Sequence, residues 1–234
     1  MKNSITLITA SLLLLASQSH GQSNGGGAAT KRVYLNSGLG LSFPGVANLN
    51  AELTKAGFLP LSRVYFARGA GLYTLFPKAH LATIVNFSSY SGTNTDKNRS
   101  TWVRGSTAGA SLGFIVRNTD RIQVIPYAGL AYSWFGTRLS AVAPASTAFS
   151  SYLNGPTNQQ HLGLEQYLGN VGLQVVKPGL GKGAVASQLI IGLRGGYFFP
   201  LNTPTWQTNS VDLGGGPTIN PGGTYLHLVI GSSL

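Results

Sequence analysis

The sequence has few charged residues, no cysteine and no long apolar run. Only 9% of its 234 residues are charged, whereas roughly 25% is usual in soluble domains, and 43% are hydrophobic. This composition excludes a coiled coil, which needs abundant Glu, Lys and Leu. It also argues against a disordered chain, because disorder combines low hydrophobicity with high charge. The hydrophobic share is large enough to bury a core.

The absence of cysteine excludes disulfides, thiolate metal sites and a cysteine-based lipid anchor. Beyond the first 22 residues no run of about 18 apolar residues occurs, which excludes a protein that crosses the membrane with helices. The few charges are mostly positive, with 16 Lys and Arg against 5 Asp and Glu. The sequence must therefore reconcile a hydrophobic composition with the lack of an apolar helix.

The first 22 residues have the three parts of a secretory signal peptide. Lys2 is followed by an apolar run from Ile5 to Ala16 and then by a small polar exit that ends near Gln22. The run is shorter than the ~20 residues that span a bilayer, so we expect cleavage rather than anchoring. Residues 23–31 are rich in Gly, Ala and Ser and predict a flexible linker. Residues 32–234 then form one exported domain.

Alternation with a period of two dominates this domain. Between Ser100 and Val116 the even positions are mostly apolar, and the odd positions are mostly Gly, Ser and Thr. The ranges 121–134, 167–175, 189–199 and 225–231 repeat this pattern, and the ranges 33–43, 63–76 and 81–91 show it less cleanly. Such alternation is typical of strands with two different faces. We therefore predict eight strands.

The connections between these strands alternate in length. They are long around 44–62, 140–166 and 200–222, medium at 92–99, and short or modest at 77–79, 117–120 and 178–183. This alternation is typical of an outer-membrane barrel, with short periplasmic turns and longer external loops. The predicted fold is all-β: an eight-stranded antiparallel up-and-down transmembrane β-barrel, rather than a soluble β-sandwich. Pro126 conflicts with it unless a bulge or register shift accommodates the proline.

Two groups of side chains follow from the predicted barrel. Aromatic residues near the loop ends of strands predict an interfacial girdle, and we assign to it Phe43, Trp102, Tyr132, Trp134, Tyr167, Tyr197 and Phe199. An arginine that faced lipid at the midplane would cost about 2–4 kcal/mol, so both mid-strand arginines are expected to point inward. The predicted polar cluster of the lumen is Arg68, Asn86, Asn170, Gln174, Arg194 and His227.

The residues from Arg32 to Leu234 resemble the family of small eight-stranded outer-membrane β-barrels, the OmpA/OmpX-like group. The resemblance is carried by the Gly-rich alternating strand from Gly105 to Phe114, the segment 126–130 (PYAGL), and the final strand 224–234 (TYLHLVIGSSL). It implies a location in the outer membrane of a Gram-negative cell. In that family the last strand often ends in Phe, and here the corresponding residue is Leu234.

No motif predicts catalysis or a metal site. The run 109–113 (GASLG) matches G-x-S-x-G, and Asp120 and His161 follow in hydrolase order. A nucleophile elbow needs a sharp turn from strand to helix, whereas Ser111 falls in the middle of a predicted strand. The segment 178–183 (PGLGKG) lacks the spacing of a phosphate-binding loop. We therefore expect no enzyme activity, no metal and no cofactor.

Outside the barrel wall, the first loop places Leu49, Leu53 and Ala56 at helical spacing before Gly57, which predicts a short helix on the rim. Several cations are expected in the external loops or near the outer rim, namely Lys55, Lys97, Arg99, Arg104 and Arg138. They would suit the phosphates of lipopolysaccharide, or form a solvated surface; nucleic acid is not an expected partner.

The leading functional hypothesis is a non-enzymatic envelope protein that contacts outer-membrane lipid, lipopolysaccharide or an envelope protein through its loops. The alternatives are a small anion-permeable, porin-like pore and, less favoured, a lipid-modifying enzyme.

Overall fold

The computed structural model describes residues 32–96, 99–119, 121–141, 159–181, 183, 185–208 and 211–234. The predicted signal peptide (1–22) and linker (23–31) lie outside the described residues, as do Lys97 and Asp120. None of the helices in the described ranges has the length and hydropathy of a bilayer-spanning segment.

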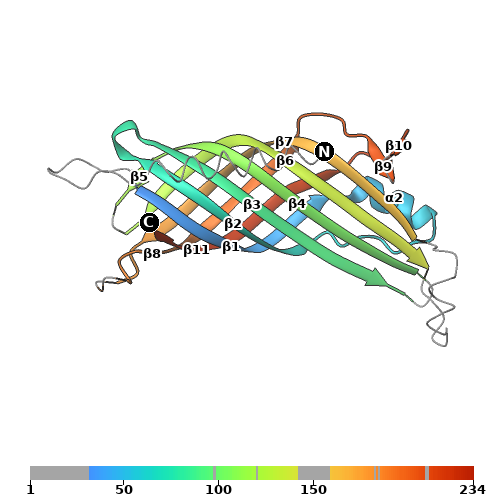
Figure 1. Ribbon diagram of the computed structural model, residues 1–234, viewed down its shortest axis with the longest axis horizontal. Coiled ribbons are helices and arrows are strands. Elements are labelled where there is room, and N and C mark those ends of the chain that lie inside the picture. The colour runs from blue at the N-terminus through green and yellow to red at the C-terminus, as the bar shows by residue number, and fades with distance from the viewer. Residues whose placement is uncertain are drawn as a thin grey trace.

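Eight antiparallel strands close into a single barrel (Figure 1), which confirms the predicted fold class. Each strand pairs with the next one around the ring, and the last strand pairs with the first. The ring consists of β1 (Arg32–Gly45), β2 (Tyr65–Phe76), β3 (Leu81–Thr95), β4 (Arg99–Phe114), β6 (Gln123–Ala141), β7 (Gln159–Pro178), β8 (Leu189–Pro200) and β11 (Asn220–Ser233).

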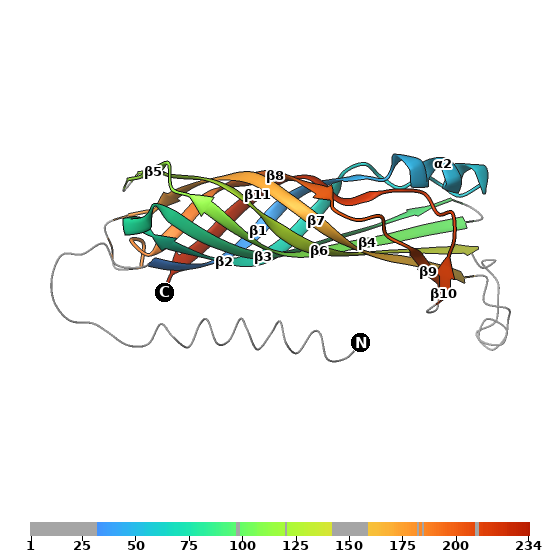
Figure 2. The ribbon, with the colours of Figure 1, turned by 90° about the horizontal axis from the view of Figure 1, so that it is seen from above.

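The strands are steeply tilted, as Figures 1 and 2 show. When the paired residues are followed once around the barrel from Val33, the path returns to β1 at Phe43, far along the same strand. A stagger of this kind is what closes a barrel with strands inclined by roughly 40°. Because the ring is closed, no strand of it keeps a free edge.

The two faces of each strand differ as the alternation predicts. On β4 and β6 the outward residues Leu112 and Leu130 are 65% and 66% exposed. Their neighbours Ser111 and Ala131 are buried inside the barrel. Long apolar side chains cover the outer wall on every strand of the ring, as a lipid-facing belt requires. The exposed leucines are thus the feature that makes this barrel a membrane protein.

Pro126 is accommodated by a shift of register near the turn end of the barrel, which is the end that carries the short turns. The last β4–β6 pair is Gly113 with Tyr127, and the short strand β5 (Arg117–Asn118) resumes pairing with β6 one residue out of step. Pro126 falls between these two ladders while its other side continues to pair with Leu173 of β7. The missing N–H therefore lies at a bulge, where a ladder bond is not required.

The opposite end, which we call the loop end, is more elaborate than the sequence predicts. Several strands are longer than the bilayer needs, with 16 residues in β4, 19 in β6 and 20 in β7. The expected connection at 92–99 is wrong in extent, because β3 continues to Thr95 and β4 begins at Arg99. The strands continue beyond the membrane in polar residues, so the apolar half of the alternating pattern is lost there. This loss explains the error.

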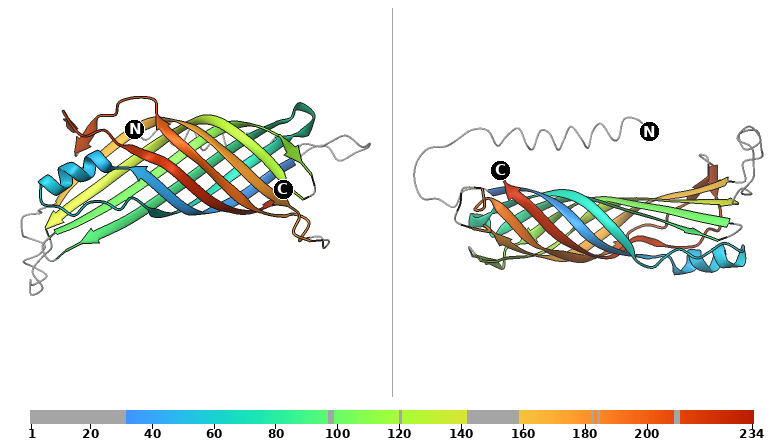
Figure 3. Two further views of the ribbon diagram at one scale, coloured as in Figure 1. Left: turned by 180° about the vertical axis from the view of Figure 1, so that it is seen from behind. Right: turned by 90° about the horizontal axis from the view of Figure 1, so that it is seen from below.

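Five further elements lie outside the ring in the described part of the chain, namely one α-helix, one 3-10 helix and three short strands. Helix α2 (Ala47–Lys55) confirms the helix predicted in the first loop, and β9 (Trp206–Thr208) and β10 (Val211–Leu213) form a small hairpin in the last loop. Both lie at the loop end (Figures 2 and 3), whereas the C-terminus, β5 and the 3-10 helix η1 (Pro77–Ala79) lie at the turn end.

The lipid-facing belt makes a direct prediction. Replacing Leu130, an outward residue in the interior of β6, by Arg should lower the stability of the folded protein in vesicles by about 2–4 kcal/mol, because the charge would face hydrocarbon. The matched change Thr93→Arg, at an exposed position near the loop end of β3, should cost ~0–1 kcal/mol. Urea titrations of folding into vesicles measure both values. Equal losses for the two variants would contradict the assignment of the belt.

Candidate functional site

The inside of the barrel has three layers along its axis. An apolar cluster lies at each end, and the level between them holds polar side chains together with a small apolar cluster of Ala131, Leu168, Phe198 and Tyr225. We call the cluster at the loop end the loop-end cap and the one at the turn end the turn-end cluster. The turn-end cluster consists of Tyr34, Tyr73, Leu75, Ala82, Ile84, Ile115, Ile125, Tyr127, Val176 and Ile190.

The loop-end cap is built by the first and last loops folding against the inner faces of the long strands. Helix α2 contributes Leu49 and Leu53, which are buried against Tyr65, Tyr90 and neighbouring side chains. The whole cap consists of Val46, Leu49, Leu53, Leu61, Tyr65, Ala67, Tyr90, Val103, Phe135, Leu139, Leu164, Trp206 and Ile219. This apolar layer closes the mouth that faces the loops.

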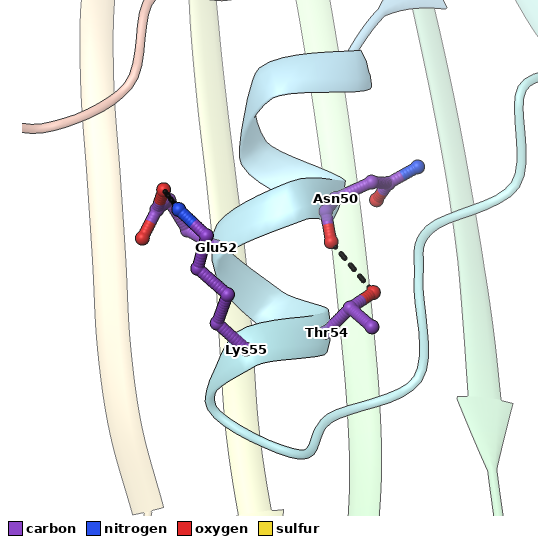
Figure 4. Close-up of polar contacts among 4 residues, drawn as sticks. All are labelled: Asn50, Glu52, Thr54 and Lys55. Carbon is purple, nitrogen blue, oxygen red and sulfur yellow. Dashed lines mark hydrogen bonds and ion pairs between the residues drawn. The ribbon is translucent and has the colours of Figure 1, made fainter.

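Polar contacts tie α2 to the chain that follows it and stabilise the helix itself; Figure 4 shows the contacts within the helix. The Asn50 side chain accepts a hydrogen bond from the Leu61 N–H at 2.7 Å and donates one to the Leu61 carbonyl at 2.9 Å, so it ties the helix to the returning chain. Thr54 donates to the Asn50 carbonyl at 2.8 Å, and Lys55 pairs with Glu52 at 2.7 Å on the exposed face.

The last loop closes the cap from the other side. Trp206, at the start of β9, packs edge-on against Phe135 with ring centroids 6.1 Å apart. Its indole N–H donates to the Pro217 carbonyl at 2.8 Å, so the buried ring leaves no unpaired donor. The hairpin is joined to the barrel wall by the pairing of Gln207 with Gly163 of β7.

Arg194 is the charged centre of the polar layer. Its side chain is only 4% exposed, and it lies in one cross-strand row with Gln174 and His227. Its Nε donates to Gln174 Oε1 at 2.7 Å and its Nη2 to Asn36 Oδ1 at 3.3 Å. Both partners are neutral amides, which accept the hydrogen bonds without balancing the charge.

A second network lies beside it and is neutral throughout. Tyr225 donates to Asn170 Oδ1 at 3.0 Å, and Asn170 Nδ2 donates to Ser111 Oγ at 3.3 Å. The hydroxyls of Tyr127 and Tyr225 lie 2.6 Å apart. Because the single proton of Tyr225 goes to Asn170, Tyr127 must be the donor in this contact.

The structure places five of the six residues predicted for the lumen inside the barrel. Asn86, Asn170, Gln174, Arg194 and His227 are buried, whereas Arg68 is exposed on the outer wall. The prediction that Arg68 points inward is therefore wrong. The inward positions around it are Ala67 and Gly69.

Stacked tyrosines explain the orientation of Arg68. Tyr73 stacks on Tyr34 with ring centroids 4.5 Å apart, and Tyr65 stacks on Tyr90 at 5.0 Å. These two inward rings belong to the odd positions of β2, so every even position faces outward. Arg68 is tolerated there because it lies toward the loop end, two residues from exposed Phe66, where the cost of a charge decreases.

The predicted girdle residues all lie on the outward side of their strands. Phe43, Tyr167, Tyr197 and Phe199 are exposed, and Trp102, Tyr132 and Trp134 are partly exposed. The ring of Tyr132 contacts Trp134 and Tyr167 edge-on, with centroid distances of 4.8 and 5.0 Å. Aromatic rings gathered in this way are typical of the level of the lipid headgroups.

The cations predicted near the rim differ in their availability. Lys55 is paired with Glu52, and Arg99 donates to the Ala56 carbonyl and lies 4.8 Å from the centroid of the Phe58 ring. Arg104 and Arg138 are exposed on the outer faces of β4 and β6. Arg138 lies over the ring of Trp102, 5.6 Å from its centroid. Together with Arg68, these two arginines carry positive charge on the loop-end part of the outer wall, and Lys177 is exposed at the turn end of β7.

The G-x-S-x-G motif does not form a hydrolase site. Ser111 lies inside the barrel, within β4 and three residues before its end, and the partner of its hydroxyl is Asn170. His161 belongs to β7 rather than to a loop, and it is exposed opposite Arg138. Within the described ranges, no three His, Asp or Glu side chains gather in a way that could hold a metal ion.

Sequence reasoning missed the tyrosines of the interior. Tyr127 and Tyr225 are central to the neutral network, yet aromatic residues in a membrane protein first suggest the lipid interface. The parity of their positions was the available signal, because both share a strand face with small or polar residues that point inward.

The closed ring, the lipid-facing belt and the aromatic girdle together define an integral outer-membrane β-barrel. Among solved structures, the chain is similar to a major outer membrane protein from Thermus thermophilus, with a TM-score of 0.54 and 12% sequence identity. The match covers 88% of this chain and 100% of that one. At this identity the likeness concerns the fold.

Another matching structure is Ail, the attachment invasion locus protein of Yersinia pestis. It has a TM-score of 0.46 and 9% identity, and the match covers 87% of this chain and 97% of Ail. No family model matches this chain, and no curated protein matches its sequence.

The neutral network predicts the effect of removing one hydroxyl. Tyr225→Phe would leave Asn170 Oδ1 without its donor and Tyr127 without its acceptor, at a cost of about 1–3 kcal/mol in folding free energy. Tyr167→Phe, the same change on the exposed outer wall, should stay within about 0.5 kcal/mol. Urea titration in vesicles compares the two. If the Tyr225→Phe protein were as stable as the control, a structural role for the network would be contradicted.

Proposed function

We propose that this protein is a non-enzymatic, non-conducting outer-membrane barrel that presents a rigid platform at the cell surface and binds the phosphates of lipopolysaccharide. The observation that carries the proposal is the loop-end cap. Thirteen buried side chains from both loops and the long strands fill the mouth of the barrel. A pore would need an open mouth there, whereas a scaffold for surface contacts gains rigidity from a filled one.

The interior below the cap supports the same function. Gln166 and Gln174 are fully buried or nearly so, and Gln123 is fully buried at the turn end, where it accepts a hydrogen bond from Tyr73 of the turn-end cluster. Eight-stranded barrels have interiors just wide enough for side chains to fill. An ion that crossed this barrel would have to displace side chains in all three layers, which argues against the anion-pore alternative.

The arrangement of arginines on the outer wall supports lipopolysaccharide as a partner. Arg68 pairs across the sheet with Ser89 of β3, and Arg104 pairs with Ser91 on the other side of the same strand. All four side chains lie on the outward face of β2, β3 and β4. Guanidinium groups bind phosphate with paired hydrogen bonds, and hydroxyls can add further donors. A phosphate at headgroup level would balance the charge of Arg68.

The first test concerns conduction. Purified protein in planar bilayers should show no steady single-channel steps, because the cap and the turn-end cluster seal both ends. Steady anion-selective steps would contradict this proposal and would favour the anion-permeable pore. The cap variant Leu53→Asp, which places a charge in the sealed layer, should give intermittent leakage or fail to fold; the exposed variant Glu52→Ala on the same helix should behave like the unaltered protein.

The second test concerns lipopolysaccharide. The double variant Arg68→Gln/Arg104→Gln should bind several-fold less lipopolysaccharide in vesicles of defined composition than the unaltered protein. Arg63→Gln, an exposed change in the loop before β2, is the matched control and should bind normally. Dephosphorylated lipid A should bind equally weakly to all three proteins. Unchanged binding by the double variant, or equal competition by an anionic phospholipid, would contradict this partner.

A further inference from the structure

Arg194 is a buried positive charge without a negative partner in the described part of the chain. Its guanidinium is always charged at physiological pH. The four acids that the structure describes are Glu52, Asp96, Glu165 and Asp212, and each is exposed near the loop end. The fifth acid, Asp120, falls outside the described residues, between β5 and β6 in the sequence. A buried charge without compensation costs several kcal/mol.

The side chains around Arg194 have spare nitrogens and no acceptor for them. Because Asn36 and Gln174 accept from the guanidinium with their amide oxygens, their NH₂ groups are left for another acceptor. Asn36 Nδ2, Gln174 Nε2 and His227 Nε2 are all buried without a hydrogen-bond partner. The two amide nitrogens are donors, and the His227 Nε2 donates or accepts according to its tautomer. The surroundings of this uncompensated cation therefore hold at least two spare donors. Buried donors left unpaired carry the full cost of their desolvation.

The barrel wall beside these groups is made of glycine. On the inward faces of β1 and β2, Gly38 pairs with Gly69, and Asn36 pairs with Gly71. A Cβ built on Gly71 would lie 3.3 Å from Asn36 Oδ1 and 3.4 Å from Arg194 Nη1. A Cβ on Gly38 would meet only the His227 side chain, at 3.7 Å. On this part of the wall, Asn36 is the side chain that contacts the guanidinium, and the glycines beside it contribute none.

We infer that the barrel holds a small inorganic anion of halide size at Arg194, bound by the guanidinium and by the NH₂ groups of Asn36 and Gln174. Such an ion supplies both things that the site lacks, a negative charge and an acceptor for the spare donors. Water supplies the acceptor but leaves the charge unbalanced. The anion is a structural ion, and the inference is independent of what the outer wall binds.

The filled ends of the barrel determine how the site is tested. Because the cap and the turn-end cluster hinder exchange, the protein is refolded separately in chloride, in bromide and in gluconate at equal ionic strength. Thermal unfolding in detergent is then measured for the unaltered protein, Arg194→Met and Arg68→Met. We expect halide to raise the unfolding temperature of the unaltered protein and of Arg68→Met relative to gluconate. Arg194→Met should lose this difference.

The same halide effect in Arg194→Met, or no effect in the unaltered protein, would overturn the inference. A crystal grown in bromide gives a second reading that does not depend on any variant folding. An anomalous peak within hydrogen-bond distance of Arg194 and Asn36 is expected. A well-ordered interior that shows only water at this position would refute the anion site.

Discussion

The rest of the structure depends on one constraint, namely that neither an unpaired backbone group nor a charge is tolerated in hydrocarbon. The pairing of β11 with β1 satisfies it for the backbone, because it closes the ring and removes the last free edge. The constraint also limits where irregularities can occur. Pro126 lacks an N–H, and it lies where β4 ends and β5 continues the ladder one residue out of step.

The same constraint explains why most of the fold could be predicted from the sequence. Each strand meets lipid on one side and side chains on the other, so alternation appears directly in the residue order, most clearly from Ser100 to Val116. The first-loop helix was also predictable, since Leu49 and Leu53 are spaced to share one face. Local patterns were sufficient in both cases because the burial of each residue follows from its position within its own element.

Predictions failed where the deciding contact is distant in sequence. Arg68 was expected inside the barrel because a lipid-facing arginine is costly, and the pattern of β2 alone was ambiguous. Its parity is determined by Tyr73 stacking on Tyr34 and by Tyr65 stacking on Tyr90, contacts that exist only after three strands have assembled. The helix of the loop-end cap was predicted from local spacing, but its packing with β6 and the last loop was not, for the same reason.

The distribution of charge connects the fold to the proposed function. In the described part of the chain, the charged residues lie mainly near the two ends of the barrel. Arg63, Arg68, Arg104 and Arg138 are among those at the loop end, whereas Lys78, Arg117, Arg121 and Lys177 lie at the turn end. Arg194 is the exception, because it is enclosed by neutral groups at the centre of the barrel. A sealed interior and an elaborate exterior suit a protein whose function is carried out at its surface.

Whether the interior is sealed from solvent can be measured directly, because the sequence has no cysteine of its own. A single cysteine is introduced at Ser111, inside the barrel, or at Glu52, on the exposed face of α2. Each protein is folded into vesicles and treated with a small charged thiol reagent. We expect rapid labelling of the cysteine at position 52, and none at position 111 until the barrel is unfolded. Rapid labelling at position 111 in the folded protein would contradict a sealed interior.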